Sequence, residues 1–154
     1  GPALAESFRY NRRVLMEERI VGCEVTVGIL DGEVLPIIEV CPKQGPLDYR
    51  NKYTQGATEC FLPARVDPPT EERIRAAAFG AFRAIGGRDY ARVDVMVPSA
   101  GHPVVLEVNT LPGMTQLSLL PRAAAAVGYS FPGLCQKMVD LALRRAPAAC
   151  RSTP

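Results

Sequence analysis

The chain lacks the features that would mark a membrane protein or a nucleic-acid-binding protein. Its 154 residues contain no run of eighteen apolar residues and no recognisable signal peptide, so no membrane-spanning helix is expected. The 18 basic and 16 acidic residues are interspersed and give a formal net charge of only +2. No polybasic stretch stands out, and neither nucleic acid nor a membrane surface is therefore an expected partner.

Histidine is also scarce, since the only one is His102, in a short turn where we expect it to be exposed and structural. A thiol without a histidine base beside it is a poor candidate nucleophile. We therefore interpret the cysteines as reduced core residues of a cytoplasmic protein. They are odd in number and lie mostly among apolar residues: Cys23, Cys41, Cys60, Cys135 and Cys150.

The chain does have enough apolar residues, 47% of the total, to bury one core, which favours a single domain or lobe. Hydrophobic periodicity predicts an α+β fold, a mixed, mainly antiparallel sheet with packed helices. We expect Thr70 and Ser118 to cap the second and third helices. The predicted helices cover 3–9, 70–85, a short stretch after 118 and 131–145, and the predicted strands cover 15–20, 23–30, 34–40, 91–98 and 103–109.

A type I′ turn at Asp31-Gly32 is predicted to join two of these strands as a hairpin. In the register that this turn sets, Glu24 faces Glu39. Pro36 cannot donate a ladder hydrogen bond, so it predicts an edge or a bulge in the second strand.

Two segments carry no clear period. Residues 41–58 are rich in Pro, Gly, Lys, Gln and Asn, which predicts a mobile active-site loop or a disordered excursion. The tail over 146–154 is expected to be frayed.

Opposed polar residues on the last predicted hairpin form the strongest candidate site. If Pro98 pairs with Pro103 across a four-residue turn, Asp94 faces Glu107 and Arg92 faces Asn109. The period of two places these four side chains on one face of the ribbon. The apolar residues of the two strands are expected on the other face: Val93, Val95, Leu106 and Val108.

Directly opposed carboxylates repel each other unless something compensates their charge. A divalent cation would do so, and two carboxylates with the amide oxygen of Asn109 suit Mg²⁺ or Mn²⁺ better than zinc. The alternative is a solvated polar face with no ligand. The Pro-Gly loop that follows, residues 110–115, favours a site, because its backbone N–H groups can be presented to a ligand.

The motifs of this region closely resemble the C-terminal part of D-alanine–D-alanine ligases, in the ATP-grasp superfamily. They are Arg92-Val-Asp94-Val, Glu107-Val-Asn109-Thr-Leu-Pro-Gly113-Met-Thr and Ser118-Leu-Leu-Pro. Residues 14–20, 22–27 and 48–53 resemble the same family in the expected order. The resemblance covers nearly the whole chain and implies the C-terminal lobe of an ATP-grasp fold.

By that resemblance, ATP phosphorylates one D-alanine and the acylphosphate is attacked by a second, a step in peptidoglycan synthesis. Two Mg²⁺ ions would be held by Asp94, Glu107 and Asn109. The residues implied to stabilise the transferring phosphate are Arg92, the Gly113 N–H and Lys52. Those implied to bind adenine and ribose are Glu17, Glu18, Ile20 and Glu24, with Lys52 also contacting ATP.

The second amino acid is implied to meet Ser118 and Leu119. A hydroxyl at a helix N-cap beside free N–H groups can bind a carboxylate, although Ser118 could equally serve only as a cap. Tyr53 favours a dipeptide product, because ligases that make D-alanyl-D-lactate typically lack this tyrosine.

The resemblance also implies that the chain is one lobe of a cytoplasmic, homodimeric enzyme whose N-terminal part, with its glycine-rich loop, is missing here. Alone, the lobe is expected to be inactive. Two alternatives remain open, a non-catalytic module that binds nucleotide or metal or associates with itself, and another ATP-grasp carboxylate–amine ligase.

Overall fold

A computed structural model describes residues 1–42 and 58–145 of the chain. Most of the predicted 41–58 loop and the whole predicted tail therefore lie outside the described residues. No helix in the described ranges is long and apolar enough to span a membrane. The helices are α1 (Pro2–Phe8), α3 (Pro68–Ala84), α4 (Leu119–Ala125) and α5 (Phe131–Arg145), and the strands are β1 (Cys23–Leu30), β2 (Glu33–Val34), β3 (Ile38–Pro42), β4 (Thr58–Phe61), β5 (Tyr90–Val97) and β6 (Val104–Asn109).

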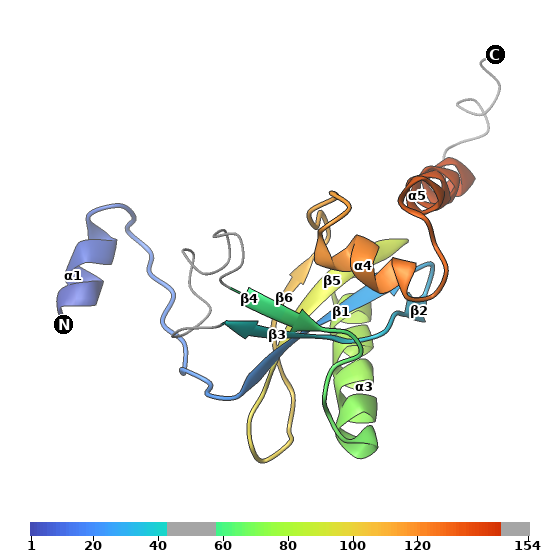
Figure 1. Cartoon of the computed structure of the whole chain (residues 1–154). Coiled ribbons are helices and arrows are strands. Elements are labelled where there is room, and N and C mark those ends of the chain that lie inside the picture. Colours follow the sequence, from blue (N-terminus) through green and yellow to red (C-terminus); the bar gives the residue numbers. More distant parts are fainter. Residues whose placement is uncertain (43–57, 146–154) are drawn as a thin grey trace.

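One sheet organises the lobe. Its strands lie in the order β4-β3-β1-β5-β6, with β2 beside the end of β1, and each of these pairs is antiparallel. Helix α3 covers one face of the sheet, while α4 and α5 lie over the other (Figure 1). The predicted α+β architecture is confirmed.

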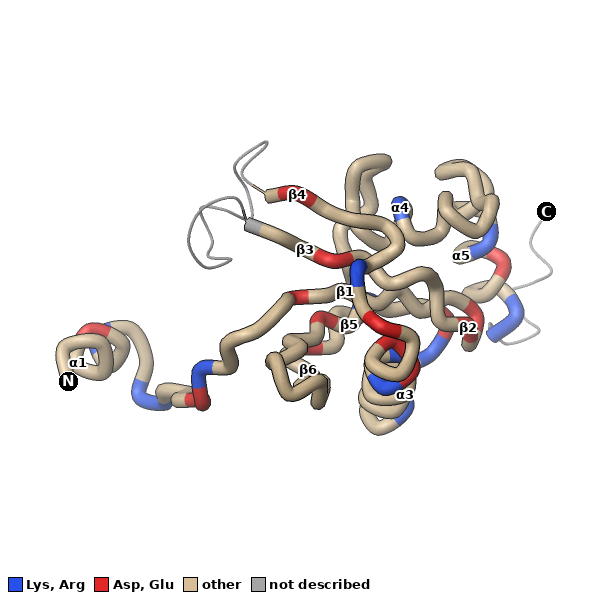
Figure 2. The backbone as a smooth tube through the Cα atoms, turned by 60° about the horizontal axis from the view of Figure 1, so that its bottom comes forward, with Lys and Arg blue, Asp and Glu red and all other residues tan. Residues whose placement is uncertain are grey.

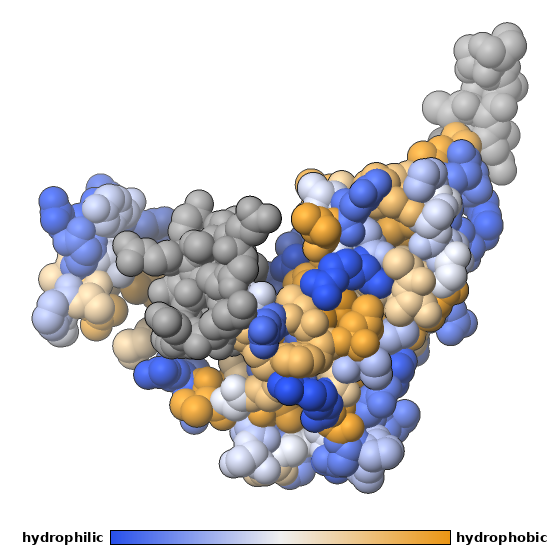
Figure 3. Space-filling model, viewed as in Figure 1, coloured by the Kyte–Doolittle hydropathy of each residue, from blue (hydrophilic) through white to orange (hydrophobic). Residues whose placement is uncertain are grey.

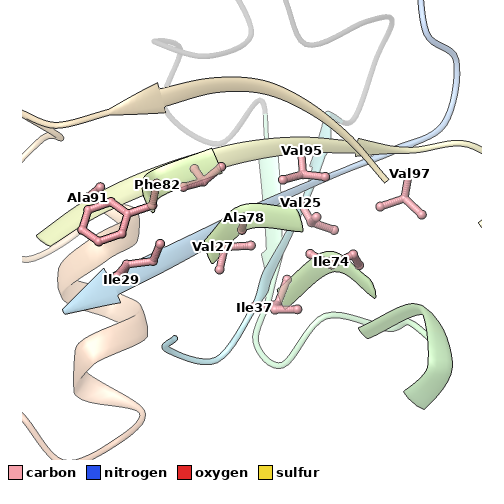
Figure 4. Close-up of a cluster of buried hydrophobic side chains, with 11 residues drawn as sticks. Val25, Val27, Ile29, Ile37, Ile74, Ala78, Phe82, Ala91, Val95 and Val97 are labelled. Atoms are coloured by element: carbon pink, nitrogen blue, oxygen red, sulfur yellow. The ribbon is translucent and has the colours of Figure 1, made fainter. Parts of the chain in front are cut away.

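The face against α3 carries the larger core. Strand β1 contributes alternate residues, Val25, Val27 and Ile29, all fully buried, as its period of two predicts. They pack with residues of β5 and α3 (Figure 4): Val93, Val95, Val97, Ile74, Ala78 and Phe82.

A second core lies under α4 and α5 and is built around Leu30, Ile38, Leu120 and Leu134. Gly28 lets α4 approach the sheet closely, because a Cβ at this position would lie only 2.9 Å from Cδ1 of Leu120. These two helices cover only part of the face, which leaves the remainder available for a site.

The cap of α3 differs from the prediction. Asp67, not Thr70, is the N-cap residue, and its carboxylate accepts a hydrogen bond from the Thr70 backbone N–H at 2.9 Å. Pro68 and Pro69 occupy the first turn, where a helix needs no N–H partner, so the helix begins two residues earlier than predicted.

The hairpin between β1 and β2 has the predicted turn, since Asp31 and Gly32 both have positive φ, at 51° and 82°. The strand then breaks at Pro36, and the register shifts by one residue before β3. As a result Glu39 lies opposite Val25, and the prediction that Glu24 faces Glu39 is wrong. A shift of one residue moves a side chain to the other face of the sheet.

The predicted strand over 15–20 is also wrong. In the structure, residues 11–22 form neither helix nor strand and lead from β1 to α1, which stands apart from the sheet (Figures 1 and 3). No described strand pairs with this segment, and Leu15 and Met16 are about four-fifths exposed, at 81% and 79%. A short segment without a neighbouring strand does not form a stable strand.

The hairpin of β5 and β6 confirms the predicted register at its open end, where Asp94 pairs with Glu107 and Arg92 with Asn109. A β-bulge then places Val95 opposite Val105. The extra residue is Leu106, which is 47% exposed, so the prediction that it shares the apolar face is wrong. The connecting turn is correspondingly longer than the predicted four residues, and His102 is exposed in it, as predicted.

Candidate functional site

The open part of the sheet forms the floor of a cavity of about 690 Å³. Alternate residues of all five long strands contribute to this floor, and the chain after β6 forms a wall. The floor residues are Glu24, Thr26, Val40, Thr58, Cys60, Arg92, Asp94, Glu107 and Asn109, and the wall residues are Leu111, Gly113, Leu117, Ser118, Leu119 and Arg122.

Asp94 is held on the floor of the cavity by a bidentate ion pair with Arg92. The Nε and Nη2 groups of Arg92 donate to its two oxygens at 2.9 and 2.7 Å, and the Thr26 hydroxyl donates to Oδ1 at 2.7 Å. Burial by itself would raise the pKa of Asp94, but the hydrogen bonds and charge of Arg92, with the Thr26 hydroxyl, outweigh it. The pKa therefore lies below its usual range and Asp94 is ionised.

Glu107 faces this pair from the neighbouring strand. Its Oε1 lies 3.5 Å from Nη2 of Arg92, and its side chain is 55% exposed toward the cavity. In a view coloured by charge, acidic positions stand on the neighbouring strands of the sheet (Figure 2). Two carboxylates thus share one guanidinium, which leaves this part of the floor with a net negative charge.

Asn109 completes the predicted ligand set, although its Oδ1 accepts a hydrogen bond from the Leu111 backbone N–H at 3.1 Å. The described residues contain no group of three or more His, Cys, Asp or Glu side chains that could hold a metal ion by themselves. A cation here would therefore need the Asn109 oxygen or oxygens of a ligand in addition to Asp94 and Glu107. This all-oxygen set fits Mg²⁺ or Mn²⁺.

Ser118 occupies the N-cap position of α4, as predicted, but its side chain makes no capping hydrogen bond, so that part of the prediction is wrong. Its Oγ instead accepts from the Thr115 backbone N–H at 3.0 Å and lies 2.9 Å from Thr115 Oγ1. A Cβ at Gly113 would lie 3.1 Å from Ser118 Oγ. Gly113 and Ser118 are therefore neighbours, and a side chain at 113 would crowd the wall of the cavity.

Most of the predicted site residues come together in this cavity: Glu24, Arg92, Asp94, Glu107, Asn109, Gly113, Ser118 and Leu119. Three others do not line it, since Glu17 and Glu18 are exposed and Ile20 half-buried in the irregular segment before β1. Lys52 and Tyr53 lie outside the described residues.

Two residues that line the cavity, Thr26 and Arg122, were not predicted as site residues. Thr26 follows Glu24 on the same face of β1, so the period of two already placed it beside the site. Arg122 follows Ser118 by four residues, which on a helix means the same side. Both signals were present in the sequence.

A second buried carboxylate, Glu39, lies on the other face of the sheet. Arg65 donates to it from Nε, Nη2 and its backbone N–H at 2.8 to 3.0 Å, and the Cys41 thiol donates at 3.1 Å. Hydrogen bonds from Arg65, opposed by burial, lower the pKa of Glu39 to about 2. Glu39 is not among the cavity residues, and its partners indicate a structural ion pair.

The cysteines that the structure describes are half-buried, not fully buried in the core as predicted. The four described cysteines are free. Burial, followed by the negative charge of Glu39, raises the pKa of Cys23 to about 12, so its thiolate is negligible at neutral pH. Cys150 lies outside the described residues.

One face of the antiparallel sheet packs on a helix, and the other is open and carries two opposed carboxylates. This arrangement is that of a lobe of an ATP-grasp protein. The family model described as "D-ala D-ala ligase C-terminus" matches residues 1–140, and the chain belongs to this family. The resemblance seen in the sequence motifs is thereby confirmed.

Individual relatives are similar over nearly the whole chain. A D-alanine–D-alanine ligase of Methylacidiphilum infernorum is 44% identical over 143 residues, which are 93% of this chain and 47% of the relative. One of Syntrophotalea carbinolica is 51% identical over 136 residues, 88% of this chain and 44% of the relative. The chain thus spans about half the length of the curated relatives that it matches.

Solved structures have the same fold. The D-alanine–D-alanine ligase of Bacillus anthracis in complex with ATP matches with a TM-score of 0.78 and 35% identity, over 93% of this chain and 45% of that one. The VanG D-Ala:D-Ser ligase of Enterococcus faecalis matches with a TM-score of 0.68 and 35% identity, over 80% of this chain and 37% of that one.

Proposed function

We propose that this chain is the ATP- and Mg²⁺-binding lobe of a cytoplasmic D-alanine–D-alanine ligase. The whole protein would join two D-alanines through an acylphosphate, convert ATP to ADP and supply peptidoglycan synthesis. The observation that carries the proposal is the pairing of Asp94 with Glu107, beside Arg92 and Asn109, on the open face of the sheet. The names of the relatives and the ATP complex of the Bacillus anthracis structure support it.

Phosphoryl transfer depends mainly on positioning and on neutralisation of charge. Mg²⁺ or Mn²⁺ held by Asp94, Glu107 and Asn109 would neutralise phosphate oxygens. Arg92 is oriented by its bonds to Asp94, and its Nη1 makes no hydrogen bond to a described residue. That group can therefore donate to the transferring phosphate and to the oxyanion of the tetrahedral intermediate.

The remaining roles rest more on the resemblance. Gly113 would offer its backbone N–H as a second donor, and Ser118 and Leu119 would receive the carboxylate of the second amino acid. Glu24, in the cavity, would bind the ribose. The adenine contacts proposed for Glu17, Glu18 and Ile20 lie away from the cavity in this structure. The contact of Lys52 with ATP and the preference for a dipeptide product that Tyr53 implies remain predictions. That residues 1–154 form a single lobe and that the whole enzyme is a homodimer are predictions as well.

The chain by itself is proposed to be inactive, because its relatives are about twice as long and the cavity is open above the sheet. Incubation of the chain with ATP, Mg²⁺ and D-alanine should therefore release no phosphate above background. Release at the rate of a complete ligase would contradict this part of the proposal.

The direct test is Glu107→Gln in the full-length ligase that carries this lobe. The change removes a charge but keeps the size of the side chain, and we expect D-alanine-dependent ADP release to fall by about a thousandfold or more. Because the side chain is 55% exposed, the thermal midpoint should move by only about 2 °C.

Glu33→Gln, an exposed glutamate of β2 outside the cavity, is the matched control and should keep full activity. Undiminished turnover in Glu107→Gln would refute the metal assignment. A wild-type ligase whose ADP release does not depend on D-alanine would refute the proposed function itself.

A further inference from the structure

Helix α4 presents an unused positive charge to the cavity. The helix is fixed against the sheet by buried residues on its inner side, and Leu120 packs where Gly28 leaves room. This packing fixes the side of α4 that faces the cavity. Arg122 is on that side, half-buried, one helical turn after Ser118, and both residues line the cavity.

The two arginines of the cavity, Arg92 and Arg122, differ in whether an acidic side chain pairs with them. Arg92 is committed to Asp94 and Glu107 through distances of 2.7 to 3.5 Å. The Arg122 side chain, in contrast, has no hydrogen bond and no ion pair with any residue in the described ranges. A half-buried guanidinium is best satisfied by a planar anion that accepts two hydrogen bonds, as a carboxylate does.

Ser118 provides a second polar group next to this charge. Its Oγ already accepts a hydrogen bond from the Thr115 backbone N–H, so its own proton is free to be donated, either to Thr115 Oγ1 or to a ligand. Leu117 and Leu119 lie beside it on the same wall. A cation, a hydroxyl and apolar side chains together match a small amino acid with a carboxylate and a methyl group.

We propose that Arg122 binds the carboxylate of the second amino acid and helps to determine specificity for that substrate. This inference rests on the proposed ligase function and adds to it a residue on α4. A carboxylate fits better than a phosphate, because the phosphate is proposed to lie at Arg92 on the floor of the cavity, whereas Arg122 belongs to the wall with Ser118.

Steady-state kinetics of the full-length ligase test this role. Arg122→Met should raise the KM for the second D-alanine by about tenfold, the loss expected for one charge-assisted hydrogen bond in a partly exposed site. The effect on KM should exceed the effect on kcat, and the KM for ATP should stay within about twofold. Arg122→Lys should raise this KM less than Arg122→Met does, because lysine keeps the positive charge but lacks the planar guanidinium that donates two parallel hydrogen bonds.

Arg83→Met is the matched control, since Arg83 is exposed on α3 across the sheet from the cavity, and it should leave all three constants unchanged. An unchanged KM for the second D-alanine in Arg122→Met, or a rise confined to the KM for ATP, would overturn the inference while leaving the proposed function intact. A wild-type ligase that does not use D-alanine would overturn both.

A binding measurement on this chain tests the contact between Arg122 and a carboxylate without requiring catalytic activity. The Nε–H resonance of Arg122, identified by its loss in Arg122→Lys, should shift on titration with D-alanine in NMR spectra. D-alaninamide keeps the amine and the methyl group but lacks the carboxylate, so it should shift this resonance much less. Equal shifts with both compounds, or none with D-alanine, would count against the carboxylate contact.

Discussion

The two faces of the sheet each carry a buried carboxylate held by an arginine, yet the surroundings differ. Glu39 is 6% exposed and Asp94 is 5% exposed, and each accepts two hydrogen bonds from a guanidinium. Glu39 also accepts from a backbone N–H and a thiol, and the residues directly opposite it are Val25 and Phe61. Asp94 lies opposite Glu107 on the floor of the cavity.

Burial and pairing with arginine therefore do not by themselves distinguish the carboxylate of the candidate site from Glu39. Pairing with arginine lowers the pKa of Glu39 and of Asp94 alike, and in both cases burial opposes the shift. What distinguishes Asp94 is a neighbouring like charge that the protein leaves only partly compensated. The stability of the fold should depend on Glu39, and the chemistry on Asp94.

The largest expected effect separates the two residues by activity. Asp94→Asn should lower turnover of the full-length ligase by about a thousandfold, or roughly 4 kcal/mol of transition-state stabilisation. Glu39→Gln should keep turnover within about threefold but reduce the free energy of unfolding by about 2 kcal/mol. This cost is smaller than for a fully buried pair, because the Arg65 side chain is 58% exposed.

D-alanine-dependent ADP release and urea denaturation measure the two effects. If Glu39→Gln impaired turnover as strongly as Asp94→Asn, the distinction between a structural and a functional carboxylate would be lost.

A smaller effect concerns pH. The pKa of Glu39 is lowered to about 2 in the folded chain, so its contribution to stability is complete above the pKa of the unfolded chain, about 4.5. As the pH falls from about 4.5 toward 2, the unfolded chain binds the proton first and the free energy of unfolding should decrease. Urea denaturation between pH 6 and pH 2.5, a window set by these values, would show the decrease.

Glu39→Gln should flatten this dependence, and the part due to Asp94, whose pKa is also lowered, should remain. An identical pH dependence in the variant and the wild type would show that Glu39 does not contribute.

The smallest expected effect tests which residues of β6 face the core. Leu106, the extra residue of the bulge, is 47% exposed, so Leu106→Gln should change the free energy of unfolding by less than about 0.5 kcal/mol. Val105 packs against the core below α3, and Val105→Ala should cost about 1 kcal/mol. A larger cost for Leu106→Gln in thermal denaturation would mean that the bulge lies elsewhere.

Local patterns were sufficient to predict much of this arrangement. The alternation of β1, the bounds of α5 and the pairing of Asp94 with Glu107 all follow from periodicity and from a short connection between strands. These features depend on residues near one another in the chain, and for such features the sequence carries the information directly.

The errors arose where one residue changes the register or where a distant partner decides. The break at Pro36 moved Glu39 to the other face, and the bulge moved Leu106 out of the core. Residues 15–20 were predicted as a strand, but no described strand pairs with them. Pro36 indicated an irregularity but not the direction of the register shift, and neither the bulge at Leu106 nor the missing neighbour leaves a clear mark in local composition.

The ion pair between Arg92 and Asp94 affects how charged ligands can bind in the cavity. Both oxygens of Asp94 already accept from Arg92, so a cation that takes Asp94 must compete with a built-in counter-ion. Displacing that guanidinium without a new partner would leave a charge uncompensated on a largely buried side chain. An incoming anion removes this cost by giving Arg92 another acceptor. The hairpin therefore favours the binding of a cation and an anion together. The cation would replace Arg92 as the partner of Asp94 and the anion would replace Asp94 as the partner of Arg92, so the local charge would stay nearly constant.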